Sequence, residues 1–173
     1  APPPGWQVGV AGVGAVAAAA RLAALLAPGG VERVLFVGTC GAYDGRLVVG
    51  DPLAAAEVIA TSLDEARGAA YRPAPERARW SPGWALPLPG HTVAVTPAVT
   101  ATEEGAAALA RLAAAEHLEL SGVFEACAQA GVPCAAALAV ANRVGPEAHL
   151  EWKANHLEVS RALLEKLREV GVI

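Results

Sequence analysis

Residues 31–51 read VERVLFVGTCGAYDGRLVVGD, and this stretch decides the fold class. An apolar run, Val31 to Val37, leads directly into the small residues Gly38-Thr39-Cys40-Gly41. Such a run predicts a strand covered on both faces, which is typical of parallel sheets. Ligands bind at the carboxyl ends of these strands, where small residues let backbone N–H groups approach an oxygen-rich ligand. The segment after Val37 is therefore the first candidate site, although a simple turn explains it equally well.

Helical and extended patterns alternate along the rest of the chain, separated by Gly and Pro. They predict strands over 7–10, 47–51, 54–61, 91–99 and 133–140, and helices over 15–26, 103–115, 122–130 and 157–170. Thr102 is placed to cap the helix that starts at Glu103. Residues 62–91, rich in Arg, Pro and Trp, predict a long loop, a kind of segment that often carries function. We expect one α/β domain over residues 1–173, with a central, mainly parallel mixed sheet flanked by helices.

Composition excludes several classes of function. The sequence is 54% hydrophobic, but alanine supplies much of this, and no window holds the roughly 18–20 strongly apolar residues of a membrane span. A net charge of -4 disfavours nucleic acid as a partner. The 3 cysteines form no CxxC pair, which argues against a disulfide framework and a zinc site. The 4 histidines are scattered and fit surface or hydrogen-bonded positions, so we expect no metal and no cofactor. Without a secretory signal pattern, cytoplasm is the default location.

Gly12-Val13-Gly14-Ala15-Val16-Ala17 fits G-x-G-x-x-A, a dinucleotide-binding pattern. That pattern requires an acidic residue at the end of the second strand, to bind a ribose hydroxyl. The corresponding strand ends in Phe36-Val37-Gly38-Thr39, which contains no acid. A tight turn with close helix packing therefore explains these glycines better than a dinucleotide does.

Three segments taken together resemble the nucleoside phosphorylase and nucleosidase superfamily. Val10-Ala11-Gly12-Val13-Gly14 and its helix resemble the family's S-G-I-G-K segment. Residues 34–51 are similar to its strand, G-[ST]-x-G-G and following G-D. Residues 118–142 match M-E-x-x-A, a helix, V-P, a strand and S-D, with Leu118-Glu119 at the start and Ala141-Asn142 at the end. The resemblance implies a three-layer, nucleoside-phosphorylase-like fold and a small-molecule purine nucleoside as the substrate.

The resemblance also implies roles for individual residues. Glu119 stands where the family's glutamate accepts both ribose hydroxyls, and an acceptor-only carboxylate suits that role. Leu118 replaces a methionine that packs on the sugar, and Thr39, Cys40 and Gly41 line the sugar side of the pocket. Asn142 stands where many members have an aspartate that assists departure of the purine. An asparagine donates a hydrogen bond but no proton, which favours a 6-oxopurine such as hypoxanthine over adenine.

Residues 142–146, NRVGP, followed by Trp152, resemble the S-N-x-V-G-P…W signature of futalosine hydrolases. Residues 99–102, VTAT, are similar to the V-T-G-T of that family. This implies hydrolysis of futalosine to hypoxanthine and dehypoxanthinylfutalosine in menaquinone biosynthesis, with Thr100 near the base. Trp152 fits a substrate contact and a packing residue equally well. Glu147 departs from the basic residue expected after Gly-Pro.

Phosphorolysis is the alternative within the superfamily. Hexameric phosphorylases carry a phosphate-binding arginine where this sequence has Phe36, so hydrolysis is favoured. Arg33 and Arg46 remain nearby and are interpreted as solvated residues. The family also has a preceding strand whose glutamate orients the attacking water, and we expect that strand to be absent here. A methylthioadenosine nucleosidase-like enzyme and a non-catalytic ligand-binding relative therefore stay open. The apolar surface and the long 62–91 segment predict a homo-oligomer.

Overall fold

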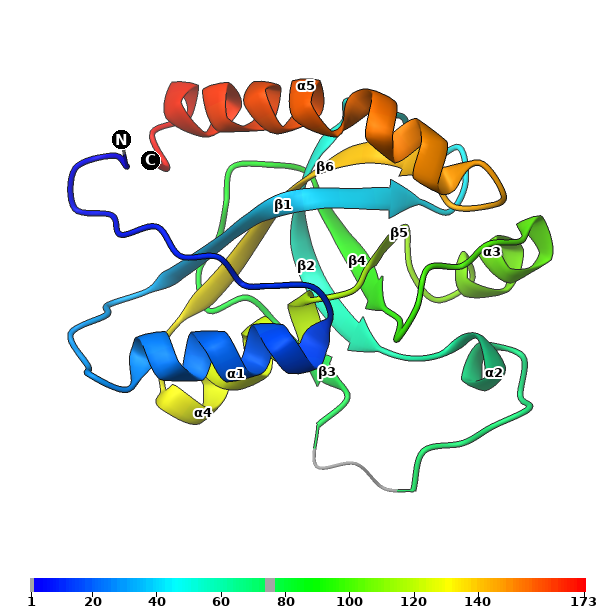
Figure 1. The fold of residues 1–173 in the computed structure, drawn as a ribbon, viewed down its shortest axis with the longest axis horizontal. Coiled ribbons are helices and arrows are strands. Elements are labelled where there is room, and N and C mark those ends of the chain that lie inside the picture. The colour runs from blue at the N-terminus through cyan, green and yellow to red at the C-terminus, as the bar shows by residue number, and fades with distance from the viewer. Residues whose placement is uncertain (1, 74–76) are drawn as a thin grey trace.

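The structure is a computed structural model that describes residues 2–73 and 77–173 (Figure 1). Its elements, in chain order, are α1 (Ala15–Leu26), β1 (Val34–Ala42), β2 (Pro52–Ala60), α2 (Leu63–Ala66), β3 (Arg79–Trp80), β4 (Gly90–Val95), α3 (Glu103–Leu109), β5 (Ala115–His117), α4 (Leu120–Ala130), β6 (Cys134–Arg143) and α5 (Ala148–Glu169). Helices and strands alternate through most of this order, as an α/β fold requires.

The strands form one mixed sheet in the order β3-β2-β4-β5-β1-β6. Strand β1 is parallel to β6, and β4 is parallel to both β2 and β5, while the remaining pairs are antiparallel. A further antiparallel pairing of β2 with β6 closes β1, β6, β2, β4 and β5 into a ring. The closed arrangement leaves β3 as the outlying strand and brings distant parts of the sequence to one end of β1.

Helices cover the sheet from two sides, which confirms the predicted α/β fold with a mixed sheet. Figure 1 shows α5 along one side, over β6 and β1, and the pair α1 and α4 together on the other side. Ala137, Ala139 and Ala141 of β6 face α5, and their small side chains let Val159 and Leu163 approach the strand closely. The alanine-rich character of β6 is thus a packing requirement of the sheet–helix interface.

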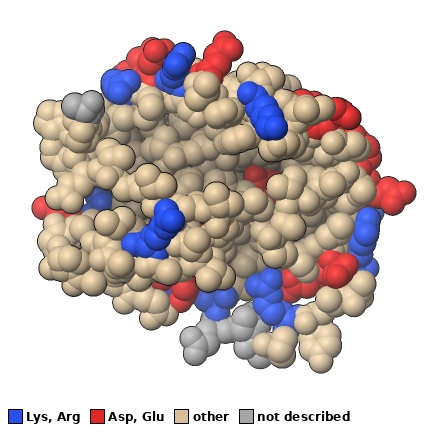
Figure 2. All heavy atoms as spheres, in the orientation of Figure 1, with Lys and Arg blue, Asp and Glu red and all other residues tan. Residues whose placement is uncertain are grey.

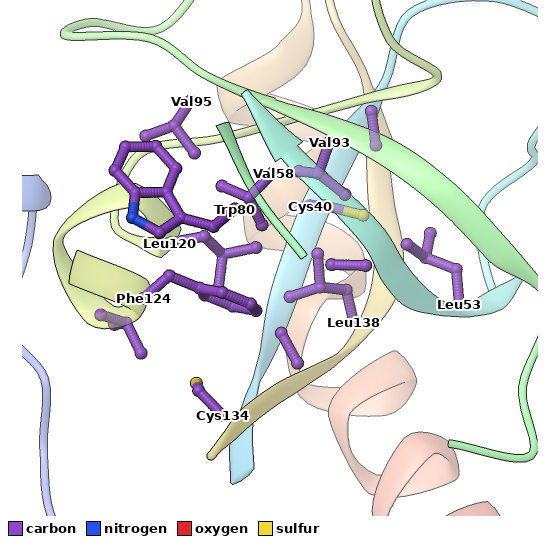
Figure 3. Packing of buried hydrophobic residues seen from close by; sticks show 14 of the residues in the cluster. Cys40, Leu53, Val58, Trp80, Val93, Val95, Leu120, Phe124, Cys134 and Leu138 are labelled. Carbon is purple, nitrogen blue, oxygen red and sulfur yellow. The ribbon is translucent and has the colours of Figure 1, made fainter. Parts of the chain in front are cut away.

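The main core lies inside the ring of strands and beneath α4. Figure 3 shows Leu53, Val58, Val93 and Leu138 from the strands meeting Phe124 of α4. The strand side chains point inward from different elements, and all are nearly or fully buried. Burial of apolar surface on this scale is the main force that holds the ring closed.

Several predicted element boundaries are wrong. Residues 7–10 and 47–51 are not strands: in the described parts of the chain nothing pairs with residues 7–10, and Val8 is 77% exposed. The predicted helix 103–115 ends at Leu109, and Ala115 starts β5, because sheet pairing overrides the helix propensity of its alanines.

Two further segments hold more structure than expected. Residues 62–91 contain α2 and β3, and they include residues 74–76, which lie outside the described residues. Helix α5 begins nine residues before the predicted Leu157, directly after Gly145-Pro146 and a one-residue cap. Proline favours helix starts, and the polar first turns of α5 conceal this one from an apolar pattern.

None of the helices in the described ranges is both long enough and apolar enough to cross a membrane. The charged side chains on the face in Figure 2 lie mainly around its rim, with few across the broad centre.

Candidate active site

The predicted site residues meet where β1 ends. Gly41 pairs with Glu116 of β5 on one side and with Asn142 of β6 on the other. Neighbouring strands lie about 4.8 Å apart, so these three residues span roughly 10 Å across the sheet. The β1–β6 register shifts between Cys40 and Gly41, a local irregularity of the kind that re-aims side chains next to active sites. Three segments distant in sequence thus reach one place.

The absence of a side chain at Gly41 makes room for Asn142. A Cβ at Gly41 would come within 2.8 Å of both Asn142 Nδ2 and Val144 Cγ2. Asn142 is 8% exposed, and its Nδ2 donates to the carbonyl oxygen of Arg143 at 2.8 Å. An amide has two N–H donors and an acceptor oxygen, so one donor remains for a ligand.

Glu119 caps the start of α4, where helix α1 reaches it. Its Oε1 accepts a hydrogen bond from the backbone N–H of Gly14 at 2.8 Å. Helix α1 comes so close because α4 has glycine at position 122, where a Cβ would overlap the carbonyl oxygen of Ala15. The glycine-rich segment before α1 therefore binds the carboxylate of Glu119, a role that the sequence patterns did not reveal.

His117 lies beside Glu119 as a neutral ring. Burial lowers its pKa from 6.5 to about 3. Its Nδ1 accepts the backbone N–H of Glu119 at 3.0 Å, so the proton of the neutral ring sits on Nε2. Because the ring is uncharged, its 3.2 Å contact with Glu119 Oε2 is no ion pair. His117 Nδ1 and Glu119 Oε2 are both acceptors, and a ligand hydroxyl beside them would supply the missing hydrogen-bond donor. His117 thus has the hydrogen-bonded character expected from sequence, and its ring meets Phe36 edge-on.

Glu116 is a buried carboxylate that sequence reasoning missed. Its Oε1 accepts the backbone N–H of Thr100 at 3.0 Å, and its Oε2 accepts the hydroxyls of Thr100 at 2.5 Å and Tyr43 at 3.1 Å. Burial and the adjacent carboxylate raise the pKa of Tyr43 well above its ordinary value. The sequence does hold a signal, because Glu116 is an acid that directly follows the apolar run Ala113-Ala114-Ala115. Thr100 is therefore anchored at this end of the sheet.

The remaining predicted residues lie around the same strand end. Trp152 Nε1 donates to Thr39 Oγ1 at 3.1 Å, and the Trp152 ring stacks on His156 with 4.2 Å between centroids. Cys40 is buried in the main core, and burial raises its pKa to about 12, so its thiol stays protonated. Leu118 is partly buried beside Glu119.

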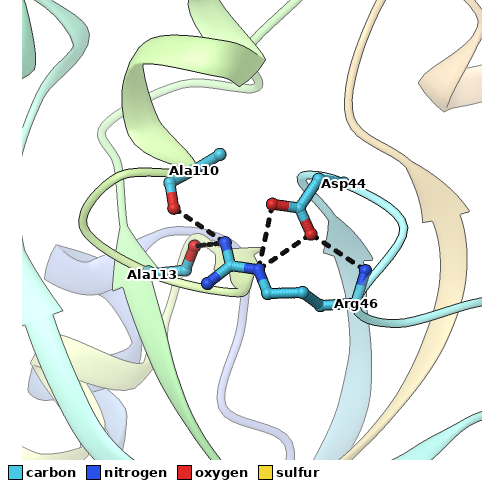
Figure 4. Close-up of polar contacts among 4 residues, drawn as sticks. All are labelled: Asp44, Arg46, Ala110 and Ala113. Carbon is cyan, nitrogen blue, oxygen red and sulfur yellow. Dashed lines mark hydrogen bonds and ion pairs between the residues drawn. The ribbon is translucent and has the colours of Figure 1, made fainter.

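Both arginines near β1 are engaged in structural contacts. Figure 4 shows Arg46, whose Nε is 2.8 Å from Asp44 Oδ1 and whose NH2 group donates to the carbonyl oxygens of Ala110 and Ala113. Arg33 lies over the rings of Trp6 and Trp84, at 5.4 and 4.7 Å from their centroids. Both arginines are exposed to solvent, as expected from sequence, but each also has specific partners.

A surface hollow of about 690 Å³ opens next to this region, lined by residues such as Tyr43, Asp44, Glu103, Arg143 and Glu151. It contains none of the predicted site residues. Glu119 follows β5 and Asn142 lies in β6, so the two flank the end of β1 from opposite sides, and within the described residues no hydrogen bond joins them. No group of three or more His, Cys, Asp or Glu in residues 2–73 and 77–173 is arranged to hold a metal ion.

Solved structures of known proteins share the fold of this chain. Futalosine hydrolase of Helicobacter pylori superposes with a TM-score of 0.81 over 92% of this chain and 76% of its own, at 19% identity. The 5'-methylthioadenosine/S-adenosylhomocysteine nucleosidase of the same organism gives 0.81 with the same coverage at 18% identity. S-adenosylhomocysteine nucleosidase of Streptococcus pyogenes gives 0.77 over 94% of this chain and 76% of its own, at 18% identity. No curated protein matches the sequence. A family model described as the phosphorylase superfamily matches residues 7–172, and the chain belongs to that superfamily.

Proposed function

We propose that this protein is an N-ribosyl hydrolase that releases a 6-oxopurine, with futalosine as its substrate and hypoxanthine as its product. The observation that carries the proposal is the position of Asn142, paired with Gly41 at the end of β1, with Glu119 following β5 on the other side of that strand. The family membership supplies the type of bond, and the asparagine supplies the preference for the base.

Glu119 and Asn142 divide the chemistry between them. Glu119 holds the 2′ and 3′ hydroxyls, because one of its oxygens is fixed by Gly14 and the other lacks a donor from His117. A water oxygen bonds to C1′ while the C1′–N9 bond breaks, and the bonding pair leaves with the base. A proton of that water finally neutralises the base. Asn142 donates to the base, at N7 or the 6-oxo group, and stabilises the charge that builds there.

Hydrolysis is preferred to phosphorolysis on electrostatic grounds. Phe36, where phosphorylases of the superfamily carry an arginine, packs edge-on against His117. Arg46 is held by Asp44 and two carbonyls, and Arg33 by two tryptophan rings. A phosphate dianion would therefore find no uncommitted guanidinium among these groups. Water is the nucleophile that fits them.

The test is base release from futalosine, inosine and methylthioadenosine, each with and without phosphate, followed by absorbance of the separated base. We expect hypoxanthine from futalosine without phosphate, and little adenine from methylthioadenosine. Strict dependence on phosphate would identify a phosphorylase, and preferred release of adenine would identify a nucleosidase of the other type. No release from any substrate would leave the non-catalytic alternative.

The role of Asn142 has its own test in the same assay. Asn142→Ala should lower kcat by about 10²–10³, the usual effect of removing one donor from developing charge. Asn155→Ala is the matched control, since that amide also donates to a β6 carbonyl, that of Ala141, at 3.0 Å. An unchanged rate in Asn142→Ala would remove this residue from the mechanism.

A further inference from the structure

The carboxylate of Glu116 is the most heavily bonded acidic group at the β1 end. It is 6% exposed, and it accepts three hydrogen bonds from two segments distant in sequence. A carboxylate accepts hydrogen bonds at both of its oxygens, so this one buried side chain holds all three donors. No Lys, Arg or His of the described ranges forms an ion pair with it. Burying a polar carboxyl group costs free energy unless it is hydrogen-bonded, and these three hydrogen bonds offset that cost.

All three donors come from residues that flank the candidate site. Thr100 contributes two of them, its N–H and its hydroxyl, and it lies in the connection between β4 and α3. Tyr43 contributes the third, directly after β1. Glu116 itself stands opposite Gly41, on the side of β1 away from Asn142. One carboxylate therefore ties residues 96–102 to the sheet at the level of Asn142.

We propose that Glu116 is a positioning residue, which holds residues 96–102 so that Thr100 stands at the base end of the site. Only the last part of this inference, the effect on purine binding, rests on the proposed function. Glu116 does not touch the substrate and acts through Thr100. Loss of its hydrogen bonds frees the segment, lowers the order of the base end and weakens binding of the purine.

Glu116→Gln is the informative variant, because it keeps the size of the side chain. Its amide nitrogen would face the Thr100 and Tyr43 hydroxyls, where a carboxylate oxygen accepts now. In the ligand-free protein, amide hydrogen exchange over residues 96–102 should become about 10- to 100-fold faster, the effect of losing the two hydrogen bonds that the hydroxyls donate. Exchange in α4 should not change. Glu57→Gln is the control, since that carboxylate pairs with Arg79 at an exposed site.

The second readout is kinetic and uses the same variants with futalosine. We expect KM for Glu116→Gln to rise about tenfold with a smaller change in kcat, because Thr100 contacts the base before and during reaction. Faster exchange in Glu116→Gln, together with no base release by the wild-type protein, would support the positioning role and contradict the proposed function. Unchanged exchange over residues 96–102, or equal acceleration in α4, would overturn the positioning role whatever the activity.

Discussion

Two regions at the end of β1 are built in different ways. The Gly41 network consists of Tyr43, Thr100, Glu116 and Asn142 around Gly41, and all five residues are buried. The Glu119 corner consists of Gly14, His117 and Glu119, and its link to α1 is one hydrogen bond from Gly14. The segment that carries Gly14 is largely exposed, with Val13 at 82% and Val16 at 86%.

The difference shows how each region obtains its geometry. Pairing of β5, β1 and β6 fixes the Gly41 network, because a strand register leaves its residues no freedom to slide. The Glu119 corner depends on the approach of α1 to α4 at Gly122, and therefore on one helix crossing. Strand pairing therefore fixes the base end, whereas the sugar end depends on how α1 packs against α4.

Replacing Glu119 should give the largest effect on activity. Glu119→Gln keeps the shape but places an N–H donor where sugar hydroxyls need an acceptor. Two charge-assisted hydrogen bonds are lost, so kcat/KM for base release should fall by about 10³. Glu165→Gln, on the exposed side of α5, is the control and should match the wild type. Full turnover in Glu119→Gln would contradict the assignment of the ribose hydroxyls to this residue.

Gly41→Ala breaks the other region without removing any polar group. The new Cβ would lie 2.8 Å from Asn142 Nδ2, so the amide must move. We expect a loss of about 1–3 kcal/mol in the free energy of unfolding, and a fall in kcat of about 10- to 100-fold. Denaturant titration and base release measure the two effects.

Gly45→Ala is the matched control for Gly41→Ala, because a Cβ there meets nothing within 4 Å. Normal turnover in Gly41→Ala would show that the position of Asn142 is not critical.

Sequence patterns located the major elements around the site but not their mutual contacts. The apolar run before Gly38 predicted β1, and alanine periodicity predicted α1 with its observed bounds. Glu119 and Asn142 were proposed as site residues because their spacing matches a family motif. Neither a period nor a motif marks Tyr43 as a partner of Glu116, since the two residues lie 73 positions apart. Such contacts form only when the ring of strands closes, and local sequence patterns do not predict which distant residues that closure brings together.

In the Glu119 corner, the lowered pKa of His117 predicts that the stability of the protein depends on pH. Its pKa is about 3 in the folded protein and near 6.5 when the chain is unfolded. Between these values the unfolded chain binds a proton that the folded chain does not. The free energy of unfolding should therefore fall as pH falls below about 6.5, by up to about 1.4 kcal/mol per unit.

The contribution of His117 is isolated by comparing variants. His117→Gln cannot take up this proton, so its stability should fall less steeply between about pH 6.5 and 4. His91→Gln, at the start of β4, should keep the wild-type dependence. Thermal unfolding at several pH values makes the measurement, and parallel curves for His117→Gln and the wild type would contradict a buried neutral ring.

The smallest effect is expected from Trp152→Phe, which decides between the two interpretations of that side chain. Phenylalanine keeps a ring against His156 but loses the Nε1–H that reaches Thr39 Oγ1 at 3.1 Å. The indole is more than one-third exposed, at 37%, so its hydrogen bond should contribute only about 0.5–1 kcal/mol to stability. In a Thr39→Val background the bond has no acceptor, and Trp152→Phe should then leave KM for futalosine unchanged if Trp152 acts only by packing. A raised KM for futalosine in both backgrounds would instead identify Trp152 as a substrate contact, because that loss would not depend on Thr39.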